Sequence, residues 1–292
     1  MRTGGKPLPG EVIIPRDSPL YAPLARMAHE GRAVFVAGLP GAGKSLLVQQ
    51  LARLAHAAGR RVHLLQWDVA RAPFETPELL ARYPEVDGAT HAAIRKAVGL
   101  WARGAVLRWH EAHPDPAYLL IGETPLVGSR LAELAQIRRD AAEALLASPA
   151  ALFAVPVPSA DVRARIEAAR EQTSASPAHG REAADAPPNV LRALWAEVAA
   201  IGARLDGAAA PAGCDYDPAA YARVYAHALR RRNHELLSID EILPAAGSVY
   251  DLGVAAGELV ATPEEVAAAV RQVEDEYGDE RLAREAEGWY EG

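Results

Sequence analysis

Short apolar runs alternate with longer segments of helical spacing along the first 170 residues. Runs of five or six mostly apolar residues predict buried strands at residues 32–37, 61–66, 117–122 and 151–155. Between them, apolar residues recur every three or four positions and predict helices at residues 46–58, 90–110, 126–146 and 159–171. Such an alternation is typical of a parallel sheet covered by helices on both faces. The pattern therefore predicts an α/β fold with a mostly parallel sheet.

The regions outside this alternation differ in composition. Residues 1–23 contain five prolines and predict an extended lead-in, with a short strand at 12–14. Residues 173–188 are dominated by Ser, Ala, Gly and Pro, which predicts a flexible linker. We therefore expect a core over residues 1–172 and a mainly helical extension over residues 189–292.

The extension carries helical patterns with two short apolar runs between them. Helices are predicted at residues 189–205, at 218–233 and from Thr262 onward, where Thr262 can cap the helix and Pro263 suits its first position. Residues 235–239 read either as a fifth strand of the core sheet or as a helix end, and residues 248–252 as a short edge strand.

The segment between the first strand and its helix is rich in glycine. It reads Gly38-Leu39-Pro40-Gly41-Ala42-Gly43-Lys44-Ser45 and fits the pattern of a glycine, four residues and Gly-Lys-Ser. Glycines let successive backbone N–H groups turn inward around a phosphate, at the N-terminus of the following helix. Lys44 would reach the β- and γ-phosphates, and Ser45 would bind Mg²⁺. The alternative is a glycine-rich turn that happens to carry Lys and Ser.

This motif makes the fold prediction more specific. We expect the three-layer sandwich of P-loop NTPases, with five strands if residues 235–239 join the sheet, and ATP and Mg²⁺ as cofactors. Nucleotide contacts are expected from Gly38 through Leu46, including Lys44 and Ser45.

Polar side chains follow the second and third predicted strands. Asp68 and Arg71 come after the second strand, and Glu123 follows the third. Ligands of open parallel sheets bind beyond the carboxyl ends of the strands. There Asp68 could accept the proton of an acceptor hydroxyl, Arg71 could bind an anionic part of the acceptor, and Glu123 could orient water or act near Mg²⁺. The alternatives are an N-cap for Asp68 and a helix-start carboxylate for Glu123.

Residues 32–170 resemble the P-loop kinases of the polynucleotide-kinase and zeta-toxin type. Besides the glycine-rich segment, Asp68-Val69-Ala70-Arg71 matches an Asp-x-x-Arg element, and Glu123-Thr124-Pro125-Leu126 looks like the acid-Thr element. A further similarity is to the run that enters the lid of these kinases, the segment over the transferring phosphoryl group. It comprises Val155-Pro156-Val157 and the arginine-bearing helix 161–170. The sequence departs from the family at Glu123, where Asp is more usual, and at Trp67, which replaces a polar residue.

The resemblance implies specific roles for these residues. Asp68 would be the general base, Arg71 an acceptor-phosphate contact, and Arg163 or Arg165 the lid cation over the transferring phosphoryl group. A solvated helix face is the alternative for the two lid arginines, and core packing is the alternative to acceptor stacking for Trp67. We accordingly assign catalysis to Lys44, Asp68, Arg163 and Arg165, acceptor binding to Arg71, Glu123 and Arg130, and the metal to Ser45 and Asp68.

Composition narrows the set of partners. The 292-residue chain has a net charge of −7, but its last 20 residues carry eight acids and two arginines, so the rest is close to neutral. This acidic tail predicts a solvated helix or a frayed end, and less readily an autoinhibitory strip. One cysteine excludes an internal disulfide, and no apolar run reaches the length of a membrane span. We expect a cytoplasmic protein without a membrane partner.

The predicted helix 90–110 carries a basic face. Lys96, Arg103 and His110 recur at seven-residue intervals, with Arg95 and Arg108 nearby. Such a face is either solvated or steers an anionic substrate.

The motifs together predict an ATP- and Mg²⁺-dependent kinase that phosphorylates a hydroxyl of a small or nucleotide-like acceptor. A polynucleotide 5′-hydroxyl is the alternative acceptor, supported by the basic helix but not by the near-neutral charge or by any groove of aromatic and basic residues. A different class of function also fits the glycine-rich motif: a nucleotide-binding switch or assembly ATPase that acts on a protein partner and uses Glu123 to orient water.

Overall fold

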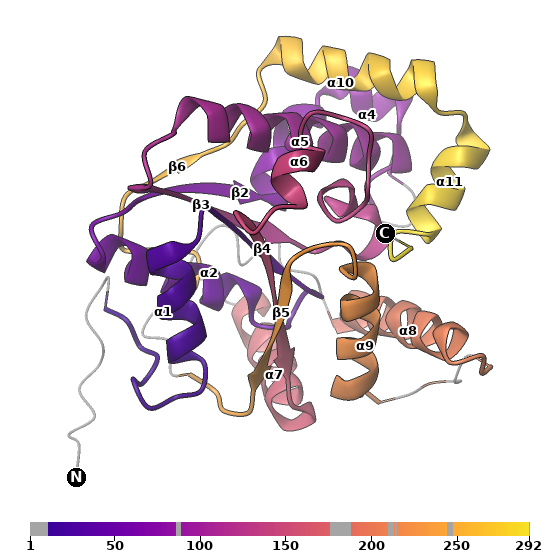
Figure 1. The fold of residues 1–292 in the computed structure, drawn as a ribbon. Helices are drawn as coiled ribbons and strands as arrows, with labels where there is room; N and C mark the ends of the chain where they lie inside the picture. The colour runs from indigo at the N-terminus through magenta and orange to yellow at the C-terminus, as the bar shows by residue number, and fades with distance from the viewer. Residues whose placement is uncertain are drawn as a thin grey trace.

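The computed structural model describes residues 11–85, 89–175, 188–209, 213, 215–243 and 248–291. These residues form an α/β fold around a six-stranded sheet in which all strand pairs are parallel (Figure 1). The strand order is β5-β4-β1-β3-β2-β6. The strands are β1 (Ala33–Ala37), β2 (Arg61–Gln66), β3 (Tyr118–Thr124), β4 (Ala151–Pro158), β5 (His234–Ile239) and β6 (Ala256–Glu258).

Helices connect and cover these strands. The α-helices are α1 (Tyr21–Glu30), α2 (Lys44–Ala57), α3 (Trp67–Arg71), α4 (Pro77–Arg82), α5 (Ala92–Ala112), α6 (Glu143–Leu146), α7 (Ala160–Ala175), α8 (Pro188–Leu205), α9 (Pro218–Ala228), α10 (Pro263–Glu276) and α11 (Asp279–Glu287). Three short 3₁₀ turns add η1 (Ala72–Phe74), η2 (Val127–Ser129) and η3 (Ala132–Leu134). Among the described residues, no helix is long and apolar enough to cross a membrane.

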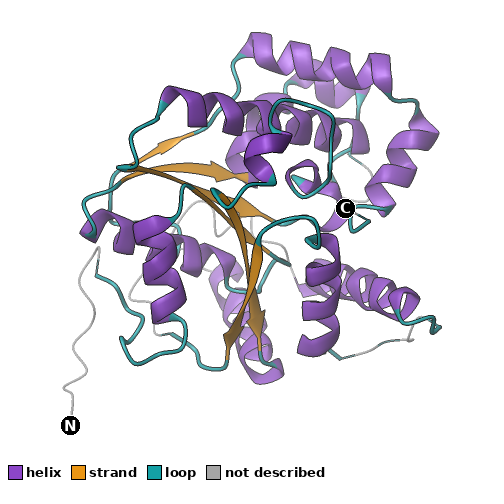
Figure 2. Cartoon of the chain, in the orientation of Figure 1, coloured by secondary structure: helices purple, strands orange, loops and turns teal. Residues whose placement is uncertain are grey.

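Alternating side chains of β1 supply the two faces of the sheet. Val34 and Val36 pack in one apolar cluster with α1 and α2, whereas Phe35 lies in a second cluster that includes α5, α9 and α10. This alternation is the two-residue period of a strand, and all five residues of β1 are buried. Figure 2 shows the sheet between the two helical layers. The sheet is therefore covered on both faces, as predicted.

The register of the parallel strands aligns their carboxyl ends. Ala37 of β1 is opposite Thr124 of β3, and Gln66 of β2 is opposite Glu123. The segments that follow β1, β2 and β3 therefore leave the sheet at one edge. This edge brings together the three segments in which the sequence predicted functional residues.

The strand predictions are confirmed with two corrections. β5 confirms the fifth strand, since it pairs with β4. The sixth strand is β6, paired with β2, and not the predicted run at 248–252. Residues 12–14 form no strand; instead Ile13 N–H donates to the Gln50 side chain at 2.8 Å.

The predicted helix at 126–146 is wrong. This segment is an irregular loop with η2, η3 and the four-residue α6. Leu126, Ser129 and Leu131 have φ of 62°, 60° and 61°, and Gly128 has φ of 61°. Left-handed residues of this kind cannot continue a right-handed helix. Most of the apolar side chains that gave the helical pattern are buried within this loop, whereas Ile137 is exposed.

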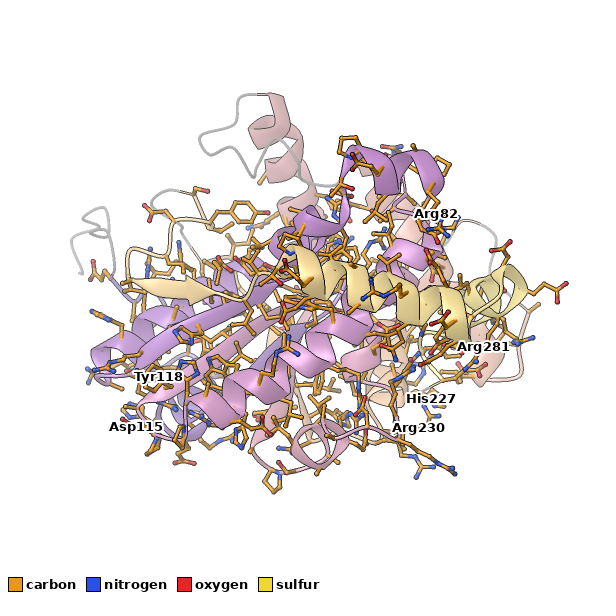
Figure 3. The ribbon with its side chains drawn as sticks, turned by 90° about the horizontal axis from the view of Figure 1, so that it is seen from above. Arg82, Asp115, Tyr118, His227, Arg230 and Arg281 are labelled. Carbon is orange, nitrogen blue, oxygen red and sulfur yellow. The ribbon has the colours of Figure 1, made fainter. Side chains whose placement is uncertain are left out.

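The acidic C-terminal segment packs against α5. α10 begins with a complete capping box at Thr262 and Glu265, which confirms the predicted helix start. Trp101 Nε1 of α5 donates to Glu265 at 3.0 Å. On the neighbouring α4, Arg82, labelled in Figure 3, pairs with Glu274 at 2.6 Å. The last 20 residues therefore contain the end of α10 and the whole of α11, and are not a frayed end. Most of their acids are exposed, as expected for a solvated helix face.

The predicted basic face of α5 lies largely inside the protein. Lys96 and Arg103 are 2% and 1% exposed, because α10, α11 and the 126–146 loop cover them. Arg103 pairs with Asp140 at 2.7 Å and Glu143 at 2.9 Å. For these two residues, neither a solvated face nor a steering surface is correct.

The predicted linker falls mostly outside the described residues. α7 extends to Ala175, three residues into residues 173–188, and α8 begins at Pro188, so residues 176–187 remain outside the described chain. The segment after them contributes β5 and β6 to the sheet and Trp289 to the same apolar cluster as Phe35.

Glu143 predicts an acid-sensitive contribution to stability. Burial alone would raise the pKa of Glu143, but hydrogen bonds from Arg232, from Arg103 and from the Arg138 N–H lower it to about 2. In the unfolded chain the carboxyl regains its ordinary pKa, so the stabilisation is present above about 4.5 and is lost as pH falls toward 2. We expect Glu143→Gln to cost about 3 kcal/mol at pH 7 and much less at pH 3. Urea unfolding of both proteins at the two pH values measures this, and an equal cost at both would contradict it.

Candidate functional site

The glycine-rich loop, residues 38–45, connects β1 to α2 and depends on its glycines. Gly41 and Gly43 have φ of 78° and 88°, in the left-handed region that glycine adopts without strain. Gly43 is the N-cap of α2. At Gly38 a Cβ atom would lie 2.4 Å from the Tyr221 hydroxyl, so a side chain has no room there. The loop thus requires glycine at all three positions.

Lys44 and Ser45 converge with Glu123 at the start of α2. Lys44 is 5% exposed; its Nζ donates to the Leu39 carbonyl at 3.1 Å and lies 3.8 Å from Glu123 Oε1. Ser45 Oγ donates to Glu123 Oε1 at 3.2 Å, and Gln66 Nε2 donates to Glu123 Oε2 at 3.4 Å. Three residues predicted as site residues from two separate segments are therefore brought into contact.

The oxygens of Ser45 and Glu123 suit a hard divalent cation. A hydroxyl and a carboxylate are ligands that Mg²⁺ accepts, with phosphate oxygens and water completing its coordination. A small cavity of about 130 Å³ lies beside Ser45, Gln66 and Glu258. Within the described residues, no group of three or more His, Cys, Asp or Glu side chains could hold a metal ion by itself. Any Mg²⁺ here would need a ligand such as a nucleotide phosphate.

Arg163 and Tyr221 pack against the outside of the loop. Arg163 of α7 is 2% exposed and its Nη1 donates to the Pro40 carbonyl at 2.8 Å. Leu39 N–H donates to the hydroxyl of Tyr221 at 3.3 Å, and burial raises the pKa of that hydroxyl well above its usual range. Of the two predicted lid arginines, Arg163 therefore touches the loop, whereas Arg165 is exposed.

Asp68 and Arg71 lie on α3, immediately after β2. The Asp68 side chain is 72% exposed and its Oδ1 lies 3.7 Å from Arg71 Nη2. Arg71 also pairs with Glu75 at 2.8 Å and donates to Thr90 Oγ1 at 3.0 Å. The N-cap alternative for Asp68 fails, because Gln66 occupies the N-cap of α3. Asp68 is thus an accessible carboxylate held next to a guanidinium.

Trp67 is a core residue. It is 7% exposed and belongs to the apolar cluster of Phe35. Packing, and not stacking on an acceptor, is therefore its role in this structure.

The loop after β3 places Arg130 near the carboxylate of Asp68. Arg130 is partly buried and its Nη1 donates to the Val127 carbonyl at 3.1 Å. Burial lowers the pKa of Arg130, the charges of Glu197 and Asp68 raise it, and the charge of Arg71 lowers it further. Arg130 therefore lies in the electric field of both α3 residues.

Sequence reasoning assigned no site role to Tyr221, and it placed Arg95 only beside the basic face of the predicted helix 90–110, which is either solvated or steers an anionic substrate. Arg95 reaches the 126–131 loop from α5, where it donates to the Gly128 carbonyl. Tyr221 comes from α9, more than 180 positions after the glycine-rich loop. Neither belongs to a local motif, so only the tertiary contacts identify them.

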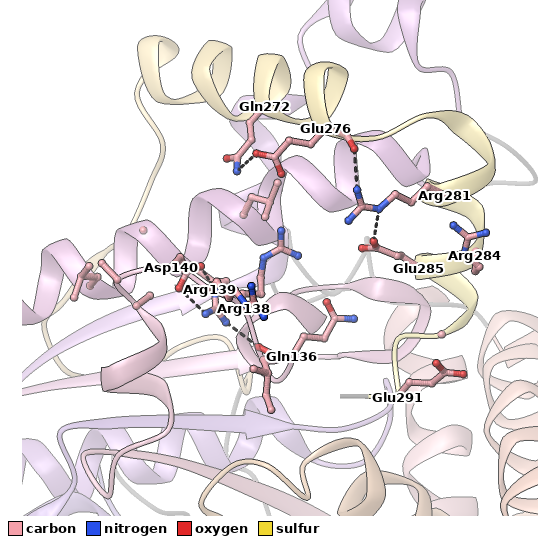
Figure 4. A pocket seen from close by; sticks show the side chains of 18 residues that line it. Gln136, Arg138, Arg139, Asp140, Gln272, Glu276, Arg281, Arg284, Glu285 and Glu291 are labelled. Carbon is pink, nitrogen blue, oxygen red and sulfur yellow. Dashed lines mark hydrogen bonds and ion pairs between the residues drawn. The ribbon is translucent and has the colours of Figure 1, made fainter.

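A separate cavity of about 930 Å³ lies between α5, residues 136–142 and the two C-terminal helices (Figure 4). No residue of the glycine-rich loop lines it. Three of its arginines already have partners: Arg103 binds Asp140, Arg138 donates to the Tyr277 hydroxyl, and Arg281 pairs with Glu285. This cavity is therefore not part of the candidate site.

The contacts separate the two residues that the sequence assigned to the metal. Ser45 contacts Glu123, whereas Asp68 contacts Arg71. The structure thus gives Glu123, previously assigned to the acceptor, a place beside the predicted metal-binding hydroxyl.

Comparisons of the chain with known protein families, with curated proteins and with solved structures found no significant match.

Proposed function

We propose that this protein is an ATP- and Mg²⁺-dependent kinase that transfers the γ-phosphate to a hydroxyl of a small or nucleotide-like acceptor. The observation that supports it best is the grouping at one edge of the sheet. Lys44, Ser45 and Glu123 are in contact there, and Asp68 with Arg71 follows β2, the strand that pairs with the one carrying Glu123. Phosphoryl transfer needs these components: a phosphate cradle, a cation site, and a carboxylate near the acceptor.

On the donor side, residues 38–45 act as a P-loop. Backbone N–H groups of the loop and the N-terminus of α2 bind the phosphates, and Lys44 moves from the Leu39 carbonyl to the β- and γ-phosphate oxygens. Ser45 and Glu123 would hold Mg²⁺, which neutralises charge on the phosphates when it is bound. The sequence assigned the metal to Ser45 and Asp68 and also allowed Glu123 to act near Mg²⁺. This proposal keeps Ser45 and Glu123 at the metal and leaves Asp68 to the acceptor.

On the acceptor side, Asp68 accepts the proton of the hydroxyl. The acceptor oxygen forms a bond to the γ-phosphorus, the bond between that phosphorus and the β–γ bridging oxygen breaks, and ADP leaves. Arg71 holds Asp68 in place and contributes positive charge toward the acceptor. Arg163 of α7 donates a hydrogen bond to the Pro40 carbonyl of the P-loop, and it can donate to a phosphate oxygen instead.

Asp68→Asn tests this assignment. We expect acceptor-dependent phosphate transfer to fall about 100-fold, the lower end of the contribution of a general base. ADP affinity should be unchanged. The measurement is label transfer from γ-labelled ATP into a mixed library of nucleosides, sugars and oligonucleotides. The matched control is Asp206→Asn, since Asp206 pairs with Arg223 at 3.0 Å on a surface away from β2.

The outcomes separate the classes of function. Loss of label transfer in Asp68→Asn, with Asp206→Asn unaffected, supports the kinase. ATP hydrolysis that needs no acceptor and survives Asp68→Asn would instead favour the nucleotide-binding switch, with Glu123 orienting water. Label appearing only in oligonucleotides would identify the polynucleotide acceptor.

A further inference from the structure

Two guanidinium groups converge on the loop after β3. Arg95 of α5 donates to the Gly128 carbonyl, and Arg130 donates to the Val127 carbonyl at 3.1 Å. A Cβ atom on Gly128 would lie 2.8 Å from Arg130 Nη1 and 3.2 Å from Arg95 Nη1. The two cations are therefore neighbours that meet at Gly128, whose φ of 61° also favours glycine.

Neither guanidinium forms an ion pair with any residue that the structure describes. Within the described residues, Arg95 and Arg130 each bind one carbonyl oxygen, and neither has a carboxylate oxygen within 4.0 Å. Arg95 Nε is buried without any hydrogen-bond partner. A guanidinium carries five N–H donors, so most donors of this pair remain unused. Two adjacent, partly buried cations without an anion are unfavourable unless a ligand supplies one.

The nearby acids are held by other groups. Glu197, whose charge acts on both arginines, accepts a hydrogen bond from Trp289 Nε1 at 2.8 Å. Glu133, whose charge also acts on Arg95, pairs with Lys96 at 2.8 Å. Asp68 lies beside Arg71. None of these described carboxylates lies within 4.0 Å of either guanidinium, and an anionic ligand would supply the missing ion pair.

We propose that Arg95 and Arg130 bind a phosphate group carried by the acceptor. Guanidinium forks match phosphate geometry, and a pair of them suits a dianion better than a single carboxylate. Arg130 lies on the loop after β3, beyond the strand that carries Glu123, and Arg95 reaches that loop from α5. The charges of Asp68 and Arg71 act on Arg130. The acceptor would therefore be a small molecule with both a free hydroxyl and a phosphate group. Its identification as the acceptor rests on the proposed kinase function, whereas the anion site itself does not.

Binding of inorganic phosphate, measured by isothermal titration calorimetry, tests the site in a Lys44→Ala background that removes the P-loop cation. In that background we expect phosphate to bind, and Arg130→Gln or Arg95→Gln to weaken it about 10- to 100-fold by removing charge-assisted hydrogen bonds. The matched control is Arg61→Gln, an exposed arginine at the opposite end of β2. It should leave the affinity unchanged.

A second variant keeps both charges. Gly128→Ala places a methyl group between the guanidiniums and should also weaken phosphate binding at least about tenfold, so a folding defect of one arginine variant does not decide the result. Phosphate binding that is absent in Lys44→Ala, or that survives both arginine substitutions, would overturn the proposal.

ADP binding to otherwise unaltered Arg130→Gln separates this proposal from the kinase proposal. ADP should bind this variant as it binds the unaltered protein, because the P-loop is intact. If ADP binds neither protein while phosphate binding still depends on Arg130, the nucleotide proposal fails and the anion site stands.

Discussion

Lys44→Ala is expected to weaken binding of ADP and ATP about 1,000-fold. The side chain is 5% exposed and its Nζ is already oriented along the glycine-rich loop by the Leu39 carbonyl and by Glu123. In the proposed complex this ammonium makes charge-assisted hydrogen bonds to two phosphate oxygens, on the β- and γ-phosphates of ATP or on the β-phosphate of ADP, each worth about 1.5–3 kcal/mol. Titration calorimetry with ADP and Mg²⁺ measures the loss.

Two controls distinguish lost phosphate contacts from a damaged fold. His56→Gln alters an exposed residue at the far end of α2 and should leave affinity unchanged. The urea midpoint of Lys44→Ala should fall only modestly, because Glu123 keeps its hydrogen bonds from Ser45 and Gln66 when it and the Leu39 carbonyl lose the ammonium. Binding of ADP to Lys44→Ala within threefold of the unaltered protein would remove the main support for a nucleotide site.

The parts of the site that the sequence predicted lie in short local motifs. Gly38 to Ser45, Asp68 and Glu123 each directly follow an apolar run, and parallel strands bring their carboxyl ends to one edge. Once the strands were recognised, the grouping followed from topology. The contact between Ser45 and Glu123 was not predicted, because it depends on which strand neighbours β1.

The errors have physical causes that no local pattern reveals. The 126–146 segment has helical apolar spacing, yet left-handed residues such as Leu126 and Ser129 fold it into a buried loop. β6 has only three residues and owes its place to pairing with β2, where Gly257 lets the His63 ring approach. Tertiary packing overrode local preference in both cases.

The charged face of α5 shows the same limit. A seven-residue repeat of Lys96, Arg103 and His110 has the form of a solvated surface, and its burial depends on acids that arrive much later in the chain. Glu285 and Glu265 are such acids, since they contact Lys96 and Trp101. The acidic tail and the basic helix, considered separately, gave no sign that they pair.

Lys96→Met is expected to destabilise the protein by about 3–5 kcal/mol, because it leaves Glu133 as an uncompensated charge in the core. Lys96 Nζ lies 2.8 Å from Glu133 Oε1 and 2.7 Å from Glu285 Oε2, and the Glu133 side chain is 0% exposed. Glu133 Oε2 has no hydrogen-bond partner. Within the described chain, Lys96 is the only cation that contacts this carboxylate. Burial tends to lower the pKa of Lys96, but the two carboxylates raise it above its usual value, so the ammonium of Lys96 stays charged at neutral pH.

Replacing both partners distinguishes a lost ion pair from a lost side chain. Lys96→Met combined with Glu133→Leu should regain most of the stability, since apolar residues of similar volume often replace a buried pair without cost. Glu285→Gln is the matched control, because it removes the other carboxylate that contacts Lys96. The Glu285 side chain is 26% exposed, so this substitution should lower the free energy of unfolding by about 1 kcal/mol or less. Urea unfolding of the four proteins gives the comparison. A double variant as unstable as Lys96→Met alone would show that the packing of the lysine stem, and not the buried charge of Glu133, holds α5 against the loop after β3.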